Sequence, residues 1–158
     1  MRIASFTPDL TDAVCRLILP IQREEFGVPV TLEGQPDLLD IPGFYQADGG
    51  FWVALEDGAV VGSVGLKRFG DAAALRKMFV AREFRGSAFG VGQGLLTELL
   101  AFARADGLVA VWLGTTEAFL AAHRFYEKNG FERVAAEALP PTFPRVAVDN
   151  VFYRKTLA

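Results

Sequence analysis

The part of the chain best suited to bind a ligand is a run of glycines that leads into a helical pattern. Residues 83 to 96 read EFRGSAFGVGQGLL and continue into TELLAFARA. The run contains four glycines: Gly86, Gly90, Gly92 and Gly94. A loop that opens a helix can bind an anion, because the N–H groups of the first turn lack intrahelical acceptors and the helix dipole adds positive partial charge. Arg85 could add a bidentate contact, so the stretch indicates a cradle for a phosphate or pyrophosphate.

Of three other interpretations of this stretch, its residues exclude the first and leave the other two open. The phosphate loop of nucleotide triphosphatases needs Gly-Lys followed by Ser or Thr, and the chain contains no such triplet. A dinucleotide-binding fingerprint needs G-x-G-x-x-G, whereas the spacing here is Gly90-x-Gly92-x-Gly94, after strands that form hairpins. The glycines could also serve close packing of the helix on a sheet, with no ligand.

Composition limits the classes of protein that the chain can belong to. With 158 residues, 51% of them hydrophobic and 22% charged, we expect one globular domain over residues 1–158. A net charge of −3 and the lack of a polybasic run argue against nucleic acid and against a membrane surface as partners. The single cysteine, the lack of a signal peptide and the lack of an 18-residue apolar span favour a cytoplasmic protein. One histidine argues against a His-rich site, and we expect no metal.

The elements that position the glycine loop follow from hydrophobic spacing and turn residues. Thr7-Pro8-Asp9 predicts a capped helix start, Pro20 an interruption, and Gly107 a helix end. Strands are predicted over 2–7, 51–55, 59–69, 72–80, 108–114, 131–135 and 145–157. Helices are predicted over 8–25, 36–46, 91–106 and 117–130. The order predicts a mixed α+β fold with a largely antiparallel sheet.

Two motifs in the second half resemble those of the GNAT superfamily of N-acetyltransferases. Motif A is matched by Val80, by Arg85-Gly86 and by the run Gly90-Val91-Gly92-Gln93-Gly94. Motif B, which reads A-x-x-x-Y-x-K-x-G-F, is matched by AHRFYEKNGF over residues 122–131. The resemblance covers residues 50–134, and both motifs at this separation are highly specific.

The resemblance implies a fold, a co-substrate and a set of binding residues. The implied fold is a mixed, mostly antiparallel sheet of six or seven strands flanked by about four helices. The implied co-substrate is acetyl-CoA, with its pyrophosphate in the glycine loop and its pantetheine arm along the preceding strand. The residues that match the family's cofactor-binding positions are Met78, Phe79, Val80, Arg85, Gly90, Val91 and Gly92.

The loop departs from the family pattern. Arg85 stands five residues before Gly90, so the loop is two residues longer, with Ala88-Phe89 inserted. Alignment on the glycines instead places Ser87 at the arginine position, and we favour Arg85 because its distance from the strand is kept. Phe119 stands where many relatives carry Asn.

The resemblance also implies the reaction: transfer of an acetyl group to a primary amine, with Tyr126 as the general acid. A phenol with a pKa near 10 can protonate a departing thiolate whose thiol has a pKa near 8.5. The alternative for Tyr126 is a core aromatic residue beside Phe119, Ala122 and Phe125, which share its face at helical spacing. For the base, Glu24, Glu25 and Glu117 are candidates, although each fits a solvated surface acid, and His123 fits a half-exposed helix position.

The acceptor is expected to be a small molecule. The acidic residues Glu33, Asp37, Asp40 and Asp48 could suit a cationic amine, or could be an ordinary solvated surface. The main alternative function is an acyl-CoA-binding sensor or partner module without catalysis, and a further one is an enzyme for another acyl group. A homodimer through residues 146–157 is possible.

Overall fold

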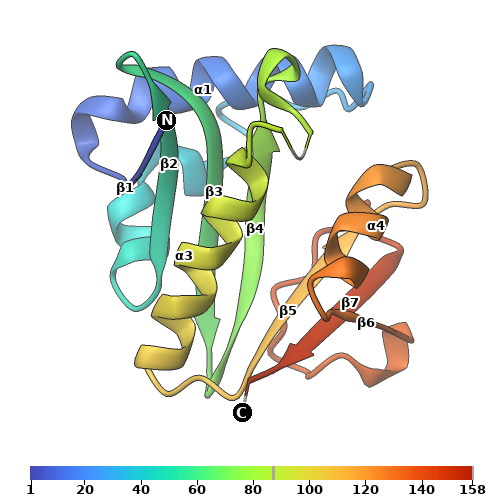
Figure 1. Ribbon diagram of the computed structural model, residues 1–158. Helices are drawn as coiled ribbons and strands as arrows, with labels where there is room; N and C mark the ends of the chain where they lie inside the picture. The colour runs from blue at the N-terminus through green and yellow to red at the C-terminus, as the bar shows by residue number, and fades with distance from the viewer. Residues whose placement is uncertain (87, 158) are drawn as a thin grey trace. The chain divides into compact units, whose positions relative to one another are not determined.

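The computed structural model describes residues 1–86 and 88–157 (Figure 1). Its strands are β1 (Arg2–Ser5), β2 (Gly50–Glu56), β3 (Ala59–Phe69), β4 (Ala72–Val80), β5 (Ala110–Thr115), β6 (Glu132–Val134) and β7 (Val151–Thr156). Its α-helices are α1 (Thr11–Pro20), α2 (Pro36–Leu39), α3 (Val91–Ala105) and α4 (Leu120–Lys128). Shorter helical segments are η1 (Pro8–Leu10), η2 (Ile21–Glu25), η3 (Pro42–Gln46), η4 (Arg82–Phe84) and η5 (Ala136–Ala138).

The strands hydrogen-bond in the order β1-β2-β3-β4-β5-β7-β6. The pairs β1–β2, β2–β3, β5–β7 and β6–β7 are antiparallel, and β4–β5 is parallel. The predicted mixed, mostly antiparallel sheet of six or seven strands with about four α-helices is therefore confirmed, and so is the order of its elements.

Contacts divide the chain into two compact units, while the single domain over 1–158 stays a prediction. The first unit comprises Met1–Lys67 and Arg76–Phe102, and the second comprises Arg68–Leu75 and Ala103–Ala158. Strand β4 and helix α3 contribute residues to both units.

Helices cover both faces of the sheet in the first unit. Gly62 and Gly65 lie three residues apart in β3, so their Cα hydrogens point to opposite faces. A Cβ at Gly62 would lie 2.8 Å from Val91 of α3, whereas a Cβ at Gly65 would lie 3.0 Å from Tyr45 of η3. On the side of η3, α1 buries Val14 and Ile18 completely. The glycine loop is thus anchored by a helix that packs directly on β3.

In the second unit, β5 is buried almost throughout and pairs with β7 over its full length. Gly107 ends α3 with φ +75°, as predicted, and the amide of Leu108 donates to the carbonyl of Ala103 (3.0 Å). Trp112 packs with Ala72 and Ala110 in the core of this unit. Motif B covers most of α4 and the turn that precedes β6, and its His123 and Tyr126 pack on Tyr153 of β7.

Two local predictions differ from the structure: the cap at Thr7 and the start of the last strand. The hydroxyl of Thr7 donates to the carboxylate of Asp9 instead of capping a backbone amide, and a 3₁₀ turn precedes α1. As predicted, Pro20 interrupts the helix: α1 ends at this residue and the chain continues as the π-helical η2. The last strand begins at Val151, because residues 145–150 lie outside the sheet, with a turn at 147–148. No helix in the described parts of the chain is long and apolar enough to cross a membrane.

Candidate functional site

The glycine loop runs from the end of β4 to the start of α3. The amide of Ala81 donates to the carbonyl of Val61 (2.8 Å), which ties the loop to β3, and η4 follows directly. Gly86 and Gly90 adopt φ +101° and +67°, a region that other residues enter only with strain. Two of the four glycines are therefore explained by the path of the backbone.

Helix α3 presents its first turn at the end of this loop. The amide of Gly94 donates to the carbonyl of Gly90 (2.9 Å), which places the amides of residues 91–93 where a helix supplies no acceptor of its own. With 15 residues, α3 has a full dipole to add at that end. Gly94 has another role, since a Cβ there would lie 3.3 Å from Ile3 of β1. Gly90, Val91 and Gly92 thus lie at the open end of the helix, as an anion site requires.

The arginine of the loop is already paired. Arg85 Nε donates to the carbonyl of Val80 (2.8 Å), and its two terminal nitrogens donate to the two carboxylate oxygens of Glu25 (2.7 and 3.0 Å). The alternative at Ser87 lies outside the described residues. The inserted Phe89 is half exposed and packs edge-to-face on Phe84, with ring centroids 5.7 Å apart. The longer loop is therefore held by one aromatic pair and one bidentate ion pair.

Strand β4 contains an irregularity at Lys77. This residue has φ +54°, which costs a side-chain-bearing residue about 1–3 kcal/mol. The buried hydroxyl of Ser63 donates to the Lys77 carbonyl (2.8 Å). Ala72 to Leu75 are buried, whereas the five residues from Arg76 to Val80 are partly exposed. Met78, Phe79 and Val80 therefore follow a strained position, on the partly exposed half of the strand.

A buried polar cluster holds the side chain of Lys77. Its ammonium donates to Gln35 Oε1 (2.8 Å) and lies 3.4 Å from the carboxylate of Asp37. The hydroxyl of Tyr45 donates to the same carboxylate (2.6 Å), and the amides of Gln22 and Gln35 exchange hydrogen bonds (3.0 and 2.9 Å). Asp37 is only 5% exposed, so the interpretation of Asp37 as part of a solvated acidic surface was wrong. No sequence motif marks this cluster.

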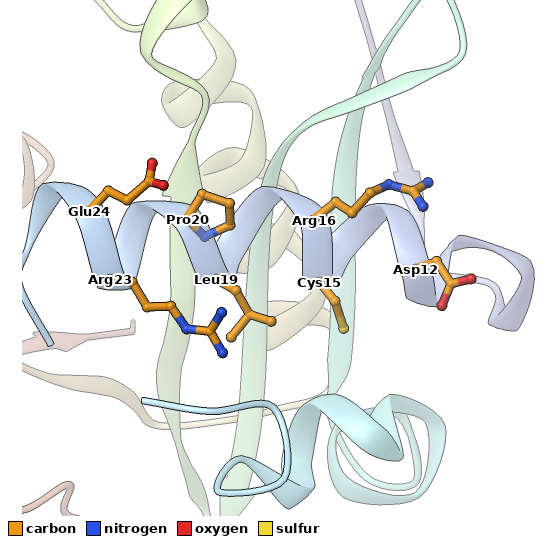
Figure 2. Close-up of a pocket in the computed structure, with 7 residues that line it drawn as sticks. All are labelled: Asp12, Cys15, Arg16, Leu19, Pro20, Arg23 and Glu24. Carbon is orange, nitrogen blue, oxygen red and sulfur yellow. The ribbon is translucent and has the colours of Figure 1, made fainter. Parts of the chain in front are cut away.

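Helix α1 borders two hollows. The first, of about 390 Å³, is lined by Asp12, Cys15, Arg16, Leu19, Pro20, Arg23 and Glu24. Figure 2 shows Cys15, Leu19 and Arg23 on one side of the helix, and Arg16, Pro20 and Glu24 on the other. Burial raises the pKa of the Cys15 thiol, which favours the unreactive protonated form. Cys15 is a core residue, as predicted.

The second hollow, of about 770 Å³, lies between α1, η2, the β2–β3 turn and the start of the glycine loop. Its charged residues are Arg16, Glu24, Glu25, Arg82 and Glu83. Of the two candidate bases here, Glu25 is the one in ion pairs. The hydrogen bond from Arg85, followed by the charges of Arg85 and Arg82, lowers the pKa of Glu25, which makes this carboxylate a poorer base.

In the second unit, Tyr126 is buried in an aromatic cluster. It is 6% exposed, and its ring centroid lies 5.6 Å from both Phe125 and Phe131 and 6.1 Å from Tyr153. Burial, and secondarily the charge of Asp149, raises the pKa of Tyr126, so its phenol is neutral over the physiological range. The same shift makes this phenol a weaker acid than an exposed tyrosine.

The other candidate residues in and before α4 make packing contacts and hydrogen bonds within the protein. His123 is 8% exposed and not half exposed as predicted, because the ring of Tyr153 packs on it with centroids 5.9 Å apart. His123 Nε2 lies 2.8 Å from the carbonyl of Thr116. Phe119 is the residue before α4, and the amide of Glu117 donates to the side chain of Asn150 (3.1 Å). Among the described residues, no group of three or more His, Cys, Asp or Glu is placed to hold a metal ion.

Comparison of the sequence with models of protein families gives a match over most of the chain. The model of the acetyltransferase (GNAT) family matches residues 15–131. The N-acetylaspartate synthetase of Danio rerio is 36% identical over 124 residues, which cover 75% of this chain and 43% of that protein. The human protein of the same name is 38% identical over 104 residues, which cover 63% and 34%. The chain thus spans less than half the length of these curated relatives.

Solved structures match over almost the whole chain. An acetyltransferase of the GNAT family from Staphylococcus aureus Mu50 superposes with a TM-score of 0.94 at 32% identity, covering 99% of both chains. An acetyltransferase from Streptococcus agalactiae gives a TM-score of 0.93 at 31% identity, covering 99% and 98%. A Thermoplasma acidophilum N-acetyltransferase solved in complex with coenzyme A shares the fold, with a TM-score of 0.75 at 15% identity and coverage of 99% and 98%.

Proposed function

The chain belongs to the GNAT family of acetyltransferases and is an acyltransferase enzyme, and on that premise we propose that it moves the acetyl group of acetyl-CoA to a small primary amine. One observation supports acetyl-CoA as the co-substrate. The glycine loop ends in the first turn of α3, at Gly90, Val91 and Gly92, where the helix itself supplies no acceptors for the backbone amides. Amides in that position suit a pyrophosphate. A relative of the same fold is known as a complex with coenzyme A, which supports the same ligand here.

The pantetheine arm would lie along Met78, Phe79 and Val80, after the irregularity of β4. The left-handed Lys77 turns the backbone at this point, and Ser63 holds its carbonyl. A backbone N–H that faces the thioester oxygen would stabilise the tetrahedral intermediate, an effect worth about 3–4 kcal/mol in other acyl transfers. We assign that task to the β4 backbone next to Lys77.

The proposed reaction is a direct attack. The amine nitrogen attacks the thioester carbonyl, a C–N bond forms, and the C–S bond breaks. The amine loses a proton to solvent, and the departing sulfur gains one from the hydroxyl of Tyr126, which is then reprotonated by water. Burial keeps the phenol of Tyr126 protonated, as a general acid must be before the reaction.

We propose that the acceptor amine also carries a carboxylate. The two curated relatives described above are named for the synthesis of N-acetylaspartate, an acetylated amine with carboxylates. Two cations flank the ring of Phe44 in the first unit: Lys67 Nζ lies 4.8 Å and Arg76 Cζ lies 5.5 Å from its centroid. The negative charge of nearby Asp37 is already neutralised by Lys77. This region therefore suits an anionic group better than the cationic amine that the acidic residues suggested.

A thermal melt with acetyl-CoA, free CoA, ATP and NAD in parallel tests the co-substrate. A ligand at 100 times its Kd adds about 2.7 kcal/mol to the stability of the native state, which is a shift of several degrees for a chain of this size. A shift with both CoA species and little change with ATP or NAD is expected. CoA binding without transfer to any amine would instead favour the acyl-CoA-binding module, and no shift with CoA would remove the proposal.

A further inference from the structure

Arg85, the residue proposed to bind the pyrophosphate, forms an ion pair with the carboxylate of Glu25 in this structure. Arg85 has five N–H donors, and Glu25 occupies one on each terminal nitrogen while Val80 accepts the one on Nε. This bidentate face is the one that a phosphate group would use. We propose that Glu25 is a built-in competitor for the co-substrate: the pyrophosphate of acetyl-CoA displaces it from Arg85, and Glu25 is then retained by Arg82. The inference rests on the function proposed above.

The first step is that both anions cannot share Arg85 without cost. Glu25 lies at the end of η2, 60 residues away in sequence, and its side chain is only 19% exposed. A partly buried carboxylate beside a pyrophosphate places like charges together at reduced solvent screening. The pair must therefore open, or weaken, when the pyrophosphate binds.

The second step is that Glu25 has another partner within reach. Arg82 Nη2 lies 3.5 Å from the same carboxylate oxygen that Arg85 binds at 2.7 Å. Both Glu25 and Arg82 line the 770 Å³ hollow, which also contains Arg16. The hollow gives the carboxylate space to turn away from Arg85 while it keeps a cation. In the one conformation seen here, Glu25 already contacts both arginines, with Arg82 the more distant of the two.

The third step concerns what the exchange does. The ion pair seen here holds the Arg85 side chain between Glu25 and the carbonyl of Val80. With co-substrate, Glu25 is released from its strongest hydrogen bond and is freed toward the hollow. Because coupling between two binding events is reciprocal, whatever strengthens the pair of Glu25 with Arg85 must weaken the binding of CoA by the same factor.

The test is isothermal titration of free CoA into wild-type protein and into Glu25→Gln. Removing a competitor worth about 1 kcal/mol should lower the Kd for CoA about five-fold. Glu83→Gln is the matched control, because it removes a charge of the same sign that lines the same hollow, at a residue for which no ion pair is seen among the described residues, and its Kd should stay within two-fold. An unchanged or higher Kd in Glu25→Gln would overturn the inference.

Variants of the two arginines test whether Glu25 moves from Arg85 to Arg82. In Arg85→Gln, CoA binds more weakly, and adding Glu25→Gln should bring no gain, because the contested guanidinium is gone. Arg82→Gln should weaken CoA binding more in the wild type than in Glu25→Gln, because only the wild type needs Arg82 to receive the carboxylate. The exchange would be contradicted if Glu25→Gln still lowered the Kd for CoA about five-fold in Arg85→Gln. It would also be contradicted if Arg82→Gln raised the Kd equally in the wild type and in Glu25→Gln. Thermal melts of the free variants identify any that fail to fold.

The two proposals fail in different ways. If the wild type binds no CoA at all, the proposed function is wrong. If the wild type binds CoA and Glu25→Gln binds it no better, the function stands and only the competition is wrong.

Discussion

The buried hydroxyl of Ser63 donates to the backbone carbonyl of Lys77 at 2.8 Å, and Lys77 is one of two residues other than glycine with positive φ among those described. The hydrogen bond joins β3 to the irregular point of β4. The ammonium of the same lysine is bound by Gln35 and Asp37. Backbone and side chain of Lys77 are therefore both fixed, which keeps the second half of β4 in one conformation.

Substitution of Ser63 by Ala should lower both stability and turnover. The Lys77 carbonyl loses a buried donor, which costs about 1–3 kcal/mol. Urea denaturation measures the loss of stability, and initial rates measure the loss of kcat. Ser5→Ala is the control, because Ser5 is exposed and its bond from Gln46 is long (3.3 Å), so a change of less than about 0.5 kcal/mol is expected. Equal stability of Ser63→Ala and Ser5→Ala would refute the role of this bond.

Substitution of Tyr126 by Phe should lower kcat without weakening CoA binding. General acids contribute about 10²–10⁴-fold to rates, so a fall in kcat of at least 100-fold is expected, with the Kd for CoA within two-fold. Tyr153→Phe is the control for a lost phenol in the same aromatic cluster, although it also loses a bond to Glu127. Steady-state rates and calorimetry give both values. A turnover equal to that of wild type would leave Tyr126 as a core aromatic residue.

Substitution of Arg76 by Gln should discriminate between acceptors. If Arg76 attracts a carboxylate, the KM for an amino acid such as aspartate rises about five-fold or more, since the lost attraction is on the order of 1 kcal/mol. The KM for an amine without a carboxylate, such as ethanolamine, stays unchanged. A rise of equal size for both acceptors would show a general effect on the fold instead of recognition of charge.

The tyrosines should resist titration in alkaline solution. The chain has three, and burial raises the pKa of Tyr45, of Tyr126 and of Tyr153, the last to about 12. A raised pKa in the folded state contributes stability that is complete below about pH 10, the ordinary phenol value, and is lost as pH rises through the folded value. Ultraviolet titration should show almost no phenolate at pH 10 in the native protein, and stability should fall between pH 10 and 12. A native tyrosine that titrates near pH 10 would contradict the burial of at least one phenol.

Local signals in the sequence were enough to predict the element order. Gly107 marked the end of α3, and the alternation of apolar residues marked the strands, because both depend on residues close together in the chain. The glycine loop was also predicted from neighbouring residues in the chain. Gly86 and Gly90 adopt positive φ there, as glycines in a local turn do. The details of helix starts were less predictable, as Thr7 shows, because its hydroxyl can either accept from a backbone amide as a cap or donate to the carboxylate of Asp9.

Contacts between distant residues were beyond prediction. Lys77 and Gln35 are 42 residues apart, and Arg85 and Glu25 are 60 apart. Nothing in the local pattern distinguishes Asp37 from a solvated acid, since its burial depends on a tyrosine and a lysine brought to it by the fold. The predicted half exposure of His123 was wrong for the same reason, because Tyr153, which covers its ring, is 30 residues away in the sequence. The residues that set charge and strain at the site were thus the ones that only the structure could identify.

The most direct test of the central claim is an acetylation assay. Purified protein is incubated with acetyl-CoA and, separately, with aspartate, other amino acids and amines without a carboxylate, and mass spectrometry follows the acceptor. The account predicts one acetyl group gained on the amine nitrogen of a carboxylate-bearing acceptor, one CoA released for each product, and a rate at least 100-fold lower in Tyr126→Phe. Tight CoA binding with no acetylated product from any acceptor would contradict it.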